Sequence, residues 1–186
     1  GGETGWAHER ILRVPTITSW TNGYKLPVVM TATCEFSRYD DHDRTSAGEY
    51  VVLNPNGGGI ALFTTTRLVY NSGNKRLNKH FHGSVYDKNN GLPNRVGDVY
   101  FVTKTKFVEN GGGDINFRKF ALLGDPAVRL ALPSHSIVTD SINGVSINGA
   151  LDTLKALSVV TIAGHVEDYA GQTLTDFDGV VYPMVY

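Results

Sequence analysis

The sequence has little of several features that would assign it to a specialised class of protein. It contains one cysteine, Cys34, so it can form neither an internal disulfide nor a cysteine-based zinc site. Its 17 Lys and Arg residues nearly balance its 18 Asp and Glu residues, and the net charge of -1 gives no electrostatic reason to expect a nucleic acid or an anionic membrane surface as the partner. The longest apolar runs, such as residues 27–30 and 59–63, are too short to span a bilayer.

The beginning of the chain also lacks a signal peptide, because Gly1, Gly2 and Glu3 supply neither a basic region nor an apolar stretch. The family resemblance described below leads us to expect that an upstream part of the protein precedes Gly1. The composition is that of a globular protein, with 41% hydrophobic and 19% charged residues. The length of 186 residues suits one domain, or one domain and part of another.

Cys34 ends a segment that is expected to form a buried strand. Residues 26–34 are β-prone and begin with a continuous apolar run, which is typical of a strand buried on both faces of an α/β sheet. Open α/β sheets place ligands and chemistry at the carboxyl ends of their strands, so this position favours a reactive thiol. A buried, inert cysteine is the alternative, and from the residue type alone it is the commoner of the two.

A strand–helix–strand unit is predicted from this first strand onward. A capping-box pattern at residues 45–49 predicts a helix over residues 48–53, which a glycine-rich turn ends. Residues 60–66 then repeat the pattern of a buried strand. Strands joined by a crossover helix pair in parallel by default. We therefore expect Cys34 and residues 64–67 to lie side by side at one rim of the sheet.

Two further helices are expected before the end of the first domain. Apolar residues recur at helical spacing over residues 74–86. Residues 97–107 are a weaker helical prediction, because they include β-branched and aromatic residues. An apolar run follows at residues 120–126 and is broken by a turn. Pro15 excludes a long helix near the start of the chain.

The last part of the chain is predicted to be all β. The pattern changes beyond Pro133, so we expect one domain over residues 1–133 and another over residues 134–186. Short β-prone segments separated by turns occur at residues 137–139, 145–147, 159–166 and 180–182. This spacing is typical of an immunoglobulin-like sandwich. A whole sandwich needs about 100 residues, so only a partial one is expected.

Several motifs resemble those of the gingipain family of cysteine peptidases. Residues 1–7, GGETGWA, resemble the segment that follows the catalytic histidine of gingipains. Residues 31–40, TATCEFSRYD, resemble the nucleophile strand of the family, most closely in its branch of type IX secretion signal peptidases and sortases. Further segments that match this branch are residues 46–49, 64–67, 122–126, 164–168 and 176–179. The motifs occur in the family's order and cover nearly the whole chain.

The resemblance implies a caspase-like α/β sheet with helices on both faces, lacking its N-terminal half and followed by the partial immunoglobulin-like domain. It implies that Cys34 is the nucleophile and forms a thioester with the substrate. The backbone N–H groups of Gly1 and Cys34 would form the oxyanion hole. The general base would be a histidine immediately before Gly1, a position that none of the 6 histidines occupies.

The resemblance also implies a substrate pocket at the end of the second strand. Thr64, Thr65, Thr66 and Arg67 would line the pocket for the residue before the scissile bond. Three hydroxyl groups would suit a small or polar side chain there. The alternatives are the ordinary preference of threonine for strands and, for Arg67, an ordinary surface charge.

The sequence calls for no cofactor and no metal ion in the predicted site. An acidic loop formed by Asp40, Asp41 and Asp43, with His42, offers carboxylates that could bind calcium. The loop lacks the EF-hand spacing and its glycine, and a solvated surface loop is the alternative. Nucleotide binding is not expected, because the glycine triplets lack a Walker lysine.

The resemblance thus implies that the parent protein is a cysteine endopeptidase and transpeptidase on the outer face of the outer membrane. It would remove C-terminal sorting domains from secreted proteins and attach the new C-terminus to a lipopolysaccharide amine, with these substrates and the secretion system's outer-membrane components as partners. The isolated chain is expected to be inactive without the upstream histidine and to self-associate through uncovered sheet edges. The alternatives are a general protein-degrading endopeptidase and a non-catalytic structural or interaction fragment.

Overall fold

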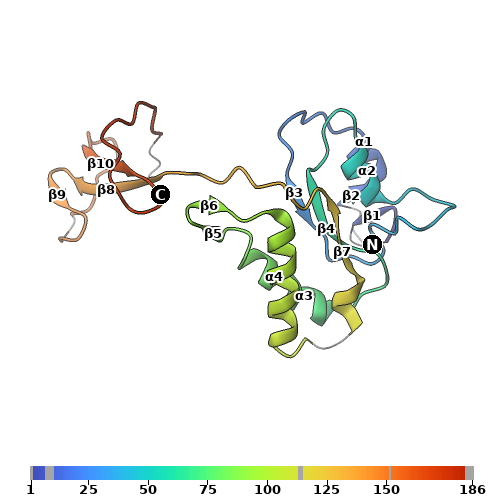
Figure 1. Ribbon diagram of the computed structural model, residues 1–186. Helices are drawn as coiled ribbons and strands as arrows, with labels where there is room; N and C mark the ends of the chain where they lie inside the picture. Colours follow the sequence, from blue (N-terminus) through green and yellow to red (C-terminus); the bar gives the residue numbers. More distant parts are fainter. Residues whose placement is uncertain (1, 7–10, 113–114, 151, 183–186) are drawn as a thin grey trace. The chain divides into compact units, whose positions relative to one another are not determined.

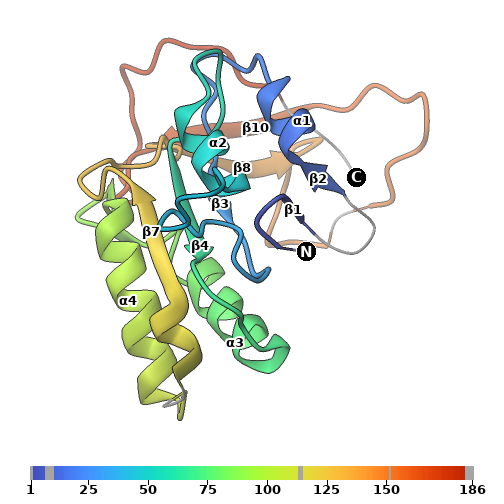
Figure 2. The ribbon, with the colours of Figure 1, turned by 90° about the vertical axis from the view of Figure 1, so that its right-hand side faces the viewer.

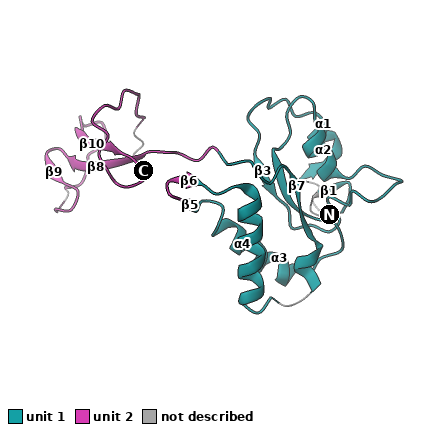
Figure 3. Cartoon of the chain, in the orientation of Figure 1, with its two compact units in different colours: residues 1–87, 93–130 teal, residues 88–92, 131–186 magenta. Residues whose placement is uncertain are grey.

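The computed structural model describes residues 2–6, 11–112, 115–150 and 152–182. The chain divides into two compact units, which are coloured separately in Figure 3. Unit 1 comprises residues 1–87 and 93–130, and unit 2 comprises residues 88–92 and 131–186. Each unit contains a three-stranded sheet of its own.

The centre of unit 1 is a mixed sheet with the strand order β3-β4-β7 (Figure 1). β3 (Val28–Met30) pairs in parallel with β4 (Ala61–Thr65), which confirms the predicted parallel pair. β7 (Phe120–Gly124) pairs antiparallel with the other side of β4. All five residues of β4 are buried, as expected of the central strand of a sheet that is covered on both faces.

β3 is shorter than the strand predicted over residues 26–34. The backbone N–H of Thr31 still donates to the carbonyl of Phe63 at 3.0 Å. Beyond it the chain turns, and the hydroxyl of Thr65 donates to the carbonyl of Thr33. A side-chain hydrogen bond therefore takes the place of the backbone ladder. Cys34 consequently lies in a turn past the strand and not within it.

Helices cover both faces of this sheet, as Figures 1 and 2 show. They are α1 (Val14–Thr18), α2 (Ala47–Leu53), α3 (Asn71–His82) and α4 (Val96–Glu109). Leu62 of β4 packs in a cluster with buried residues of α1 and α2. Its neighbour Phe63 packs in a second cluster with buried residues of α3 and α4. Successive strand residues face opposite sides, so the alternation along β4 builds a core on each face.

Local sequence signals set the helix limits in two cases, and packing sets them in a third. The predicted capping box is present at α2, where the backbone N–H of Ser46 donates to Oε2 of Glu49 at 2.8 Å. α3 ends at Gly83, earlier than predicted, and the Gly83 N–H donates to the carbonyl of Lys79. α4 forms in full despite its β-branched and aromatic residues, because its buried residues Val96, Val99, Thr103 and Phe107 recur at helical spacing.

Short elements complete unit 1. β1 (Gly5–Trp6) pairs antiparallel with β2 (Leu12–Arg13), and the 3-10 helix η1 (Ile115–Lys119) precedes β7. Pro15 lies in the first turn of α1, a helix of 5 residues, which agrees with the prediction that no long helix forms there. In the part of the chain that the structure describes, no helix is both long and apolar enough to cross a membrane.

Unit 2 contains a three-stranded antiparallel sheet with the order β10-β8-β9. Its strands are β8 (Ser136–Ile142), β9 (Val145–Ser146) and β10 (Ile162–Glu167). The turn from β8 to β9 is formed by Asn143 and Gly144, whose φ angles of 50° and 79° are left-handed and suit a tight hairpin. The short strands β5 (Lys88–Asn89) and β6 (Leu92–Pro93) form a separate two-stranded sheet.

The predicted immunoglobulin-like sandwich is not seen within the described residues. A sandwich needs a second sheet that packs on the first, and residues 180–182, which were predicted to be a strand, do not form one. Several apolar side chains of unit 2 are correspondingly exposed, among them Ile137 at 63% and Val180 at 75%. The immunoglobulin-like assignment of unit 2 therefore stays a prediction.

Candidate active site

Cys34 lies at the rim of the sheet, four residues after the end of β3. Its side chain is partly buried. The backbone N–H of Val69 donates to Sγ at 3.4 Å, and the thiol donates to the carbonyl of the same residue at 3.6 Å. Val69 follows β4, so the thiol contacts the chain leaving the neighbouring parallel strand. The sequence predicted that the reactive residues lie at this rim, where the two parallel strands end.

The turn around Cys34 has a strained backbone. Glu35 has a φ of 56°, a left-handed conformation that is uncommon for residues other than glycine. Backbone hydrogen bonds hold the turn against the segment after β4: the N–H of Glu35 donates to the carbonyl of Arg67 at 3.3 Å, and that of Ser37 donates to the carbonyl of Thr65 at 2.9 Å. The sharp bend places the cysteine at the edge of the sheet.

Two of the four residues predicted to line the substrate pocket are interior residues. Thr64 and Thr65 are fully buried. Oγ1 of Thr64 forms hydrogen bonds with the buried hydroxyls of Thr31 at 2.7 Å and Ser37 at 2.8 Å, and the hydroxyl of Thr65 bonds to the carbonyl of Thr33. Their hydroxyls are therefore committed to the sheet and its turn.

Thr66 and Arg67, the other two predicted pocket residues, lie at the surface of the rim. Thr66 is partly buried and Arg67 is exposed. The hydroxyl of Thr66 donates to the carbonyl of Lys119 at 3.2 Å. The substrate-facing role of residues 64–67 stays a prediction, and Thr66 and Arg67 are the two of them that reach the surface.

Arg67 already has a carboxylate partner within the chain. Its Nη1 and Nη2 atoms donate to Oδ1 and Oδ2 of Asp40 at 2.9 and 2.5 Å. These hydrogen bonds lower the pKa of the Asp40 carboxyl and raise the pKa of the Arg67 guanidinium. The pair ties the loop after Cys34 to the segment after β4. Asp40 is not among the described residues whose potential metal ligand atoms lie close together.

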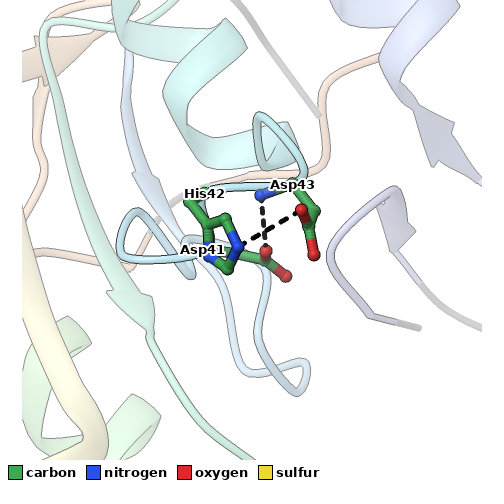
Figure 4. A group of neighbouring side chains, drawn as sticks. All are labelled: Asp41, His42 and Asp43. Atoms are coloured by element: carbon green, nitrogen blue, oxygen red, sulfur yellow. Dashed lines mark hydrogen bonds and ion pairs between the residues drawn. The ribbon is translucent and has the colours of Figure 1, made fainter.

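The remaining acidic loop residues, Asp41, His42 and Asp43, lie close together in Figure 4. Their potential ligand atoms all lie within 4.8 Å of one another. The N–H of Asp43 donates to Oδ1 of Asp41 at 3.0 Å, and Nε2 of His42 lies 3.3 Å from Oδ1 of Asp43. His42 and Asp43 are highly exposed, as expected of a solvated loop. Calcium binding stays a prediction.

The N-terminal segment is anchored beside the turn that carries Cys34. The carboxylate of Glu3, whose side chain is only 11% exposed, lies 3.1 Å from Nη1 of Arg38 and 3.9 Å from Nη1 of Arg44. The N–H of Ala47 donates to the carbonyl of Glu3 at 2.6 Å. Residues 2–6 are therefore held against the loop after Cys34. Gly1, the predicted oxyanion donor, lies outside the described residues.

Both hydrogen bonds of the Cys34 sulfur within the described residues go to Val69, and neither goes to a histidine. The position of the general base upstream of Gly1 stays a prediction. Nothing in the sequence indicated that Val69 contacts the cysteine, because no local motif marks a partner that is 35 residues away. Glu3 and Asp40 lie in motifs that the sequence did show, but their partners Arg38 and Arg67 could not be predicted from it.

Comparison with known proteins gives a match over the part of the chain that contains Cys34 and the sheet of unit 1. The family model of peptidase family C25, a family of cysteine peptidases, matches residues 1–131. A complex of the pro- and mature domains of RgpB from Porphyromonas gingivalis is similar to the chain, with a TM-score of 0.62 and 17% identity over 75% of this chain and 35% of that chain. The crystal structure of the Arg-specific cysteine proteinase gingipain R has a TM-score of 0.56 and 16% identity over 75% and 34%.

A third solved structure, dimeric latent PorU from Porphyromonas gingivalis, is 28% identical over 70% of this chain and 12% of that chain, but its TM-score of 0.34 is too low to support an argument about the fold. A search of curated proteins found no match. The chain spans about a third of the length of the two gingipain structures. Because the family model covers most of the chain and includes Cys34 and both strands of the rim, the chain belongs to peptidase family C25.

Proposed function

We propose that the parent protein is a cysteine endopeptidase and transpeptidase of gingipain type in which Cys34 is the nucleophile. The observation that supports this most strongly is the position of the thiol. It lies in a strained turn at the carboxyl ends of two parallel strands, with a backbone N–H directed at its sulfur. Open α/β sheets concentrate their chemistry at this edge.

The proposed reaction follows from the chemistry of a thiol. The Cys34 thiolate attacks the substrate carbonyl carbon, and a C–S bond forms as the carbonyl becomes an oxyanion. The C–N bond then breaks, the leaving amine takes up the proton that the base removed from the thiol, and a thioester remains. Water or an acceptor amine then attacks the thioester and gives up a proton to the base, and the C–S bond breaks to release the thiolate. The backbone N–H groups of Gly1 and Cys34 are the proposed oxyanion donors.

The anchoring of the N-terminal segment supports the proposed position of the base. Glu3 lies against Arg38, four residues after the nucleophile. A histidine immediately before Gly1 would therefore enter the structure beside the turn that carries Cys34. We propose that this chain by itself has no turnover, because a thiol without its base is weakly nucleophilic at neutral pH.

The proposed substrates are secreted proteins that carry C-terminal sorting domains. The proposed place of the reaction is the cell surface, and the proposed partners are the outer-membrane components of the secretion system. The support is the resemblance of residues 31–40 to the signal peptidase and sortase branch of the family. A general protein-degrading endopeptidase is the second candidate, favoured by the similarity in fold to gingipain R. To distinguish these two candidate functions, the parent protein and its Cys34→Ala variant are each incubated with a sorting-domain substrate and with denatured casein, and cleavage is measured.

The first test of the proposal is alkylation of Cys34 by iodoacetamide, followed by mass spectrometry. The 186-residue chain is compared with a chain extended upstream through the preceding histidine. We expect fast labelling in the extended chain alone, and loss of that rate when the histidine is changed to alanine. Equally slow labelling of both chains would mean that Cys34 is structural and would end the peptidase proposal.

A further inference from the structure

A relay of buried side-chain amides connects the two chain segments on either side of the Cys34 thiol. Nδ2 of Asn74 in α3 donates to the carbonyl of Ala32 at 2.9 Å. Nδ2 of Asn116 in η1 donates to Oδ1 of Asn74 at 3.1 Å. The backbone N–H of Tyr70 donates to Oδ1 of Asn116 at 2.8 Å. The two asparagines are 7% and 0% exposed, and buried amides need such partners to be stable.

The ends of this relay meet the cysteine from both directions. Ala32 lies two residues before Cys34. Tyr70 directly follows Val69, whose N–H donates to Sγ of Cys34 at 3.4 Å. The relay therefore links the segment that carries Cys34 to the segment that contains Val69, whose backbone N–H donates to the sulfur. A hydrogen bond donated to sulfur favours the thiolate over the thiol, and the thiolate is the nucleophile.

We propose that Asn74 and Asn116 act as one unit that positions Cys34 against the amide of Val69. Among the described residues the hydrogen bonds of the sulfur go to Val69 and not to either asparagine, so the proposed role of the asparagines is positioning and not catalysis. The proposal rests on the proposed peptidase function and adds to it the residues that keep the nucleophile in its reactive arrangement.

Gly73 of α3 supports the same unit. A Cβ at this position would lie 2.5 Å from Nδ2 of Asn116, which is closer than such contacts occur. Glycine inside a helix is less favourable than alanine by about 1 kcal/mol. The glycine thus leaves room for the asparagine where the helix itself would favour a larger residue. A Gly73→Ala variant displaces Asn116 without removing any polar group.

The test measures the rate of Cys34 alkylation by iodoacetamide in the whole chain, between about pH 6 and about pH 9.5, on both sides of the ordinary cysteine value of about 8.5. The variants are Asn74→Ala, Asn116→Ala, the double variant and Gly73→Ala. The matched controls are Asn78→Ala and Gly83→Ala. Asn78 lies on α3 and its side-chain oxygen has no hydrogen-bond partner among the described residues, while a Cβ at Gly83 would approach no atom closer than 3.4 Å.

We expect each relay variant to label about tenfold more slowly than the original chain near neutral pH, the factor expected for losing a hydrogen bond to a charged group. The difference should shrink to less than about twofold at the highest pH, where every accessible thiol is ionised. The double variant should be no slower than the slower single variant, because residues of one network are not additive. Both controls should match the original chain.

Two results would overturn the proposal. The first is that the relay variants label at the same rate as the controls. The second is that their labelling rate falls by the same factor at every pH, which indicates that the site has loosened and that access to the thiol has changed. If the alanine variant of either asparagine unfolds, Gly73→Ala still tests the proposal, because alanine is more favourable than glycine in a helix. The peptidase proposal fails on a different result, which is slow labelling of the original sequence even when it is extended through the upstream histidine.

Discussion

The buried hydroxyl chain of Thr31, Thr64 and Ser37 provides the sharpest prediction about the stability of the site. All three side chains are fully buried, and the hydroxyl of Thr64 is the shared partner of the other two. A Thr64→Val variant keeps the shape but removes both hydrogen bonds. Each is worth about 1 kcal/mol net, and a buried hydroxyl left unpaired costs about 1–3 kcal/mol. Because two buried hydroxyls, those of Thr31 and Ser37, are left unpaired, we expect the free energy of unfolding to fall by about 2–6 kcal/mol.

Urea denaturation monitored by circular dichroism measures this loss. With a slope of about 1–3 kcal/mol per M, the midpoint should fall by about 1 M or more. The matched control is Thr64→Ser, which keeps the hydroxyl and loses one methyl group, worth about 1 kcal/mol. The triple variant Thr31→Val, Ser37→Ala, Thr64→Val should regain much of the loss, because it leaves no hydroxyl of the chain unpaired. Equal losses for the valine and serine variants would refute the reasoning.

Three further predictions follow from other contacts. Gly48→Ala should destabilise unit 1 by about 1–3 kcal/mol in the same urea assay, because its Cβ would lie 1.7 Å from Oγ of Ser37; a loss no larger than that of Gly83→Ala would contradict this. His165 of β10 forms hydrogen bonds through both ring nitrogens, to Asp140 of β8 and to Glu167, and these bonds raise the pKa of its imidazole. The stability that the protonated His165 gives to the folded chain is therefore complete below about pH 6.5. It is lost as the pH rises through the raised pKa. Urea titrations at several pH values should show this trend, and a trend that survives in His165→Gln would show that another group causes it. The exposed apolar side chains of unit 2, such as Ile137 and Val159, lead us to expect self-association, and a monomer in light scattering at all concentrations would argue against it.

The sequence was sufficient to predict three local elements of unit 1, α2, β4 and α3. A capping box, a continuous apolar strand and apolar residues at helical spacing are short-range signals, and α2, β4 and α3 formed where these signals predicted them to within a few residues. α4 was predicted weakly because its β-branched residues oppose a helix, and its buried face outweighed that preference. The predicted strand at 180–182 did not form, because β propensity needs a partner strand to take effect.

The sequence by itself also predicted which residue is the nucleophile, since Cys34 is the one cysteine and its surroundings match a peptidase family. Only the tertiary structure decided how that residue is held. Val69 is 35 residues from Cys34, and Asn74 is 42 residues from Ala32. It also decided that Thr64 and Thr65 are interior residues while Arg67 pairs with Asp40. Periodicity and propensity report on neighbours within a few positions, whereas these contacts exist because parallel strands bring distant segments to the same edge of one sheet.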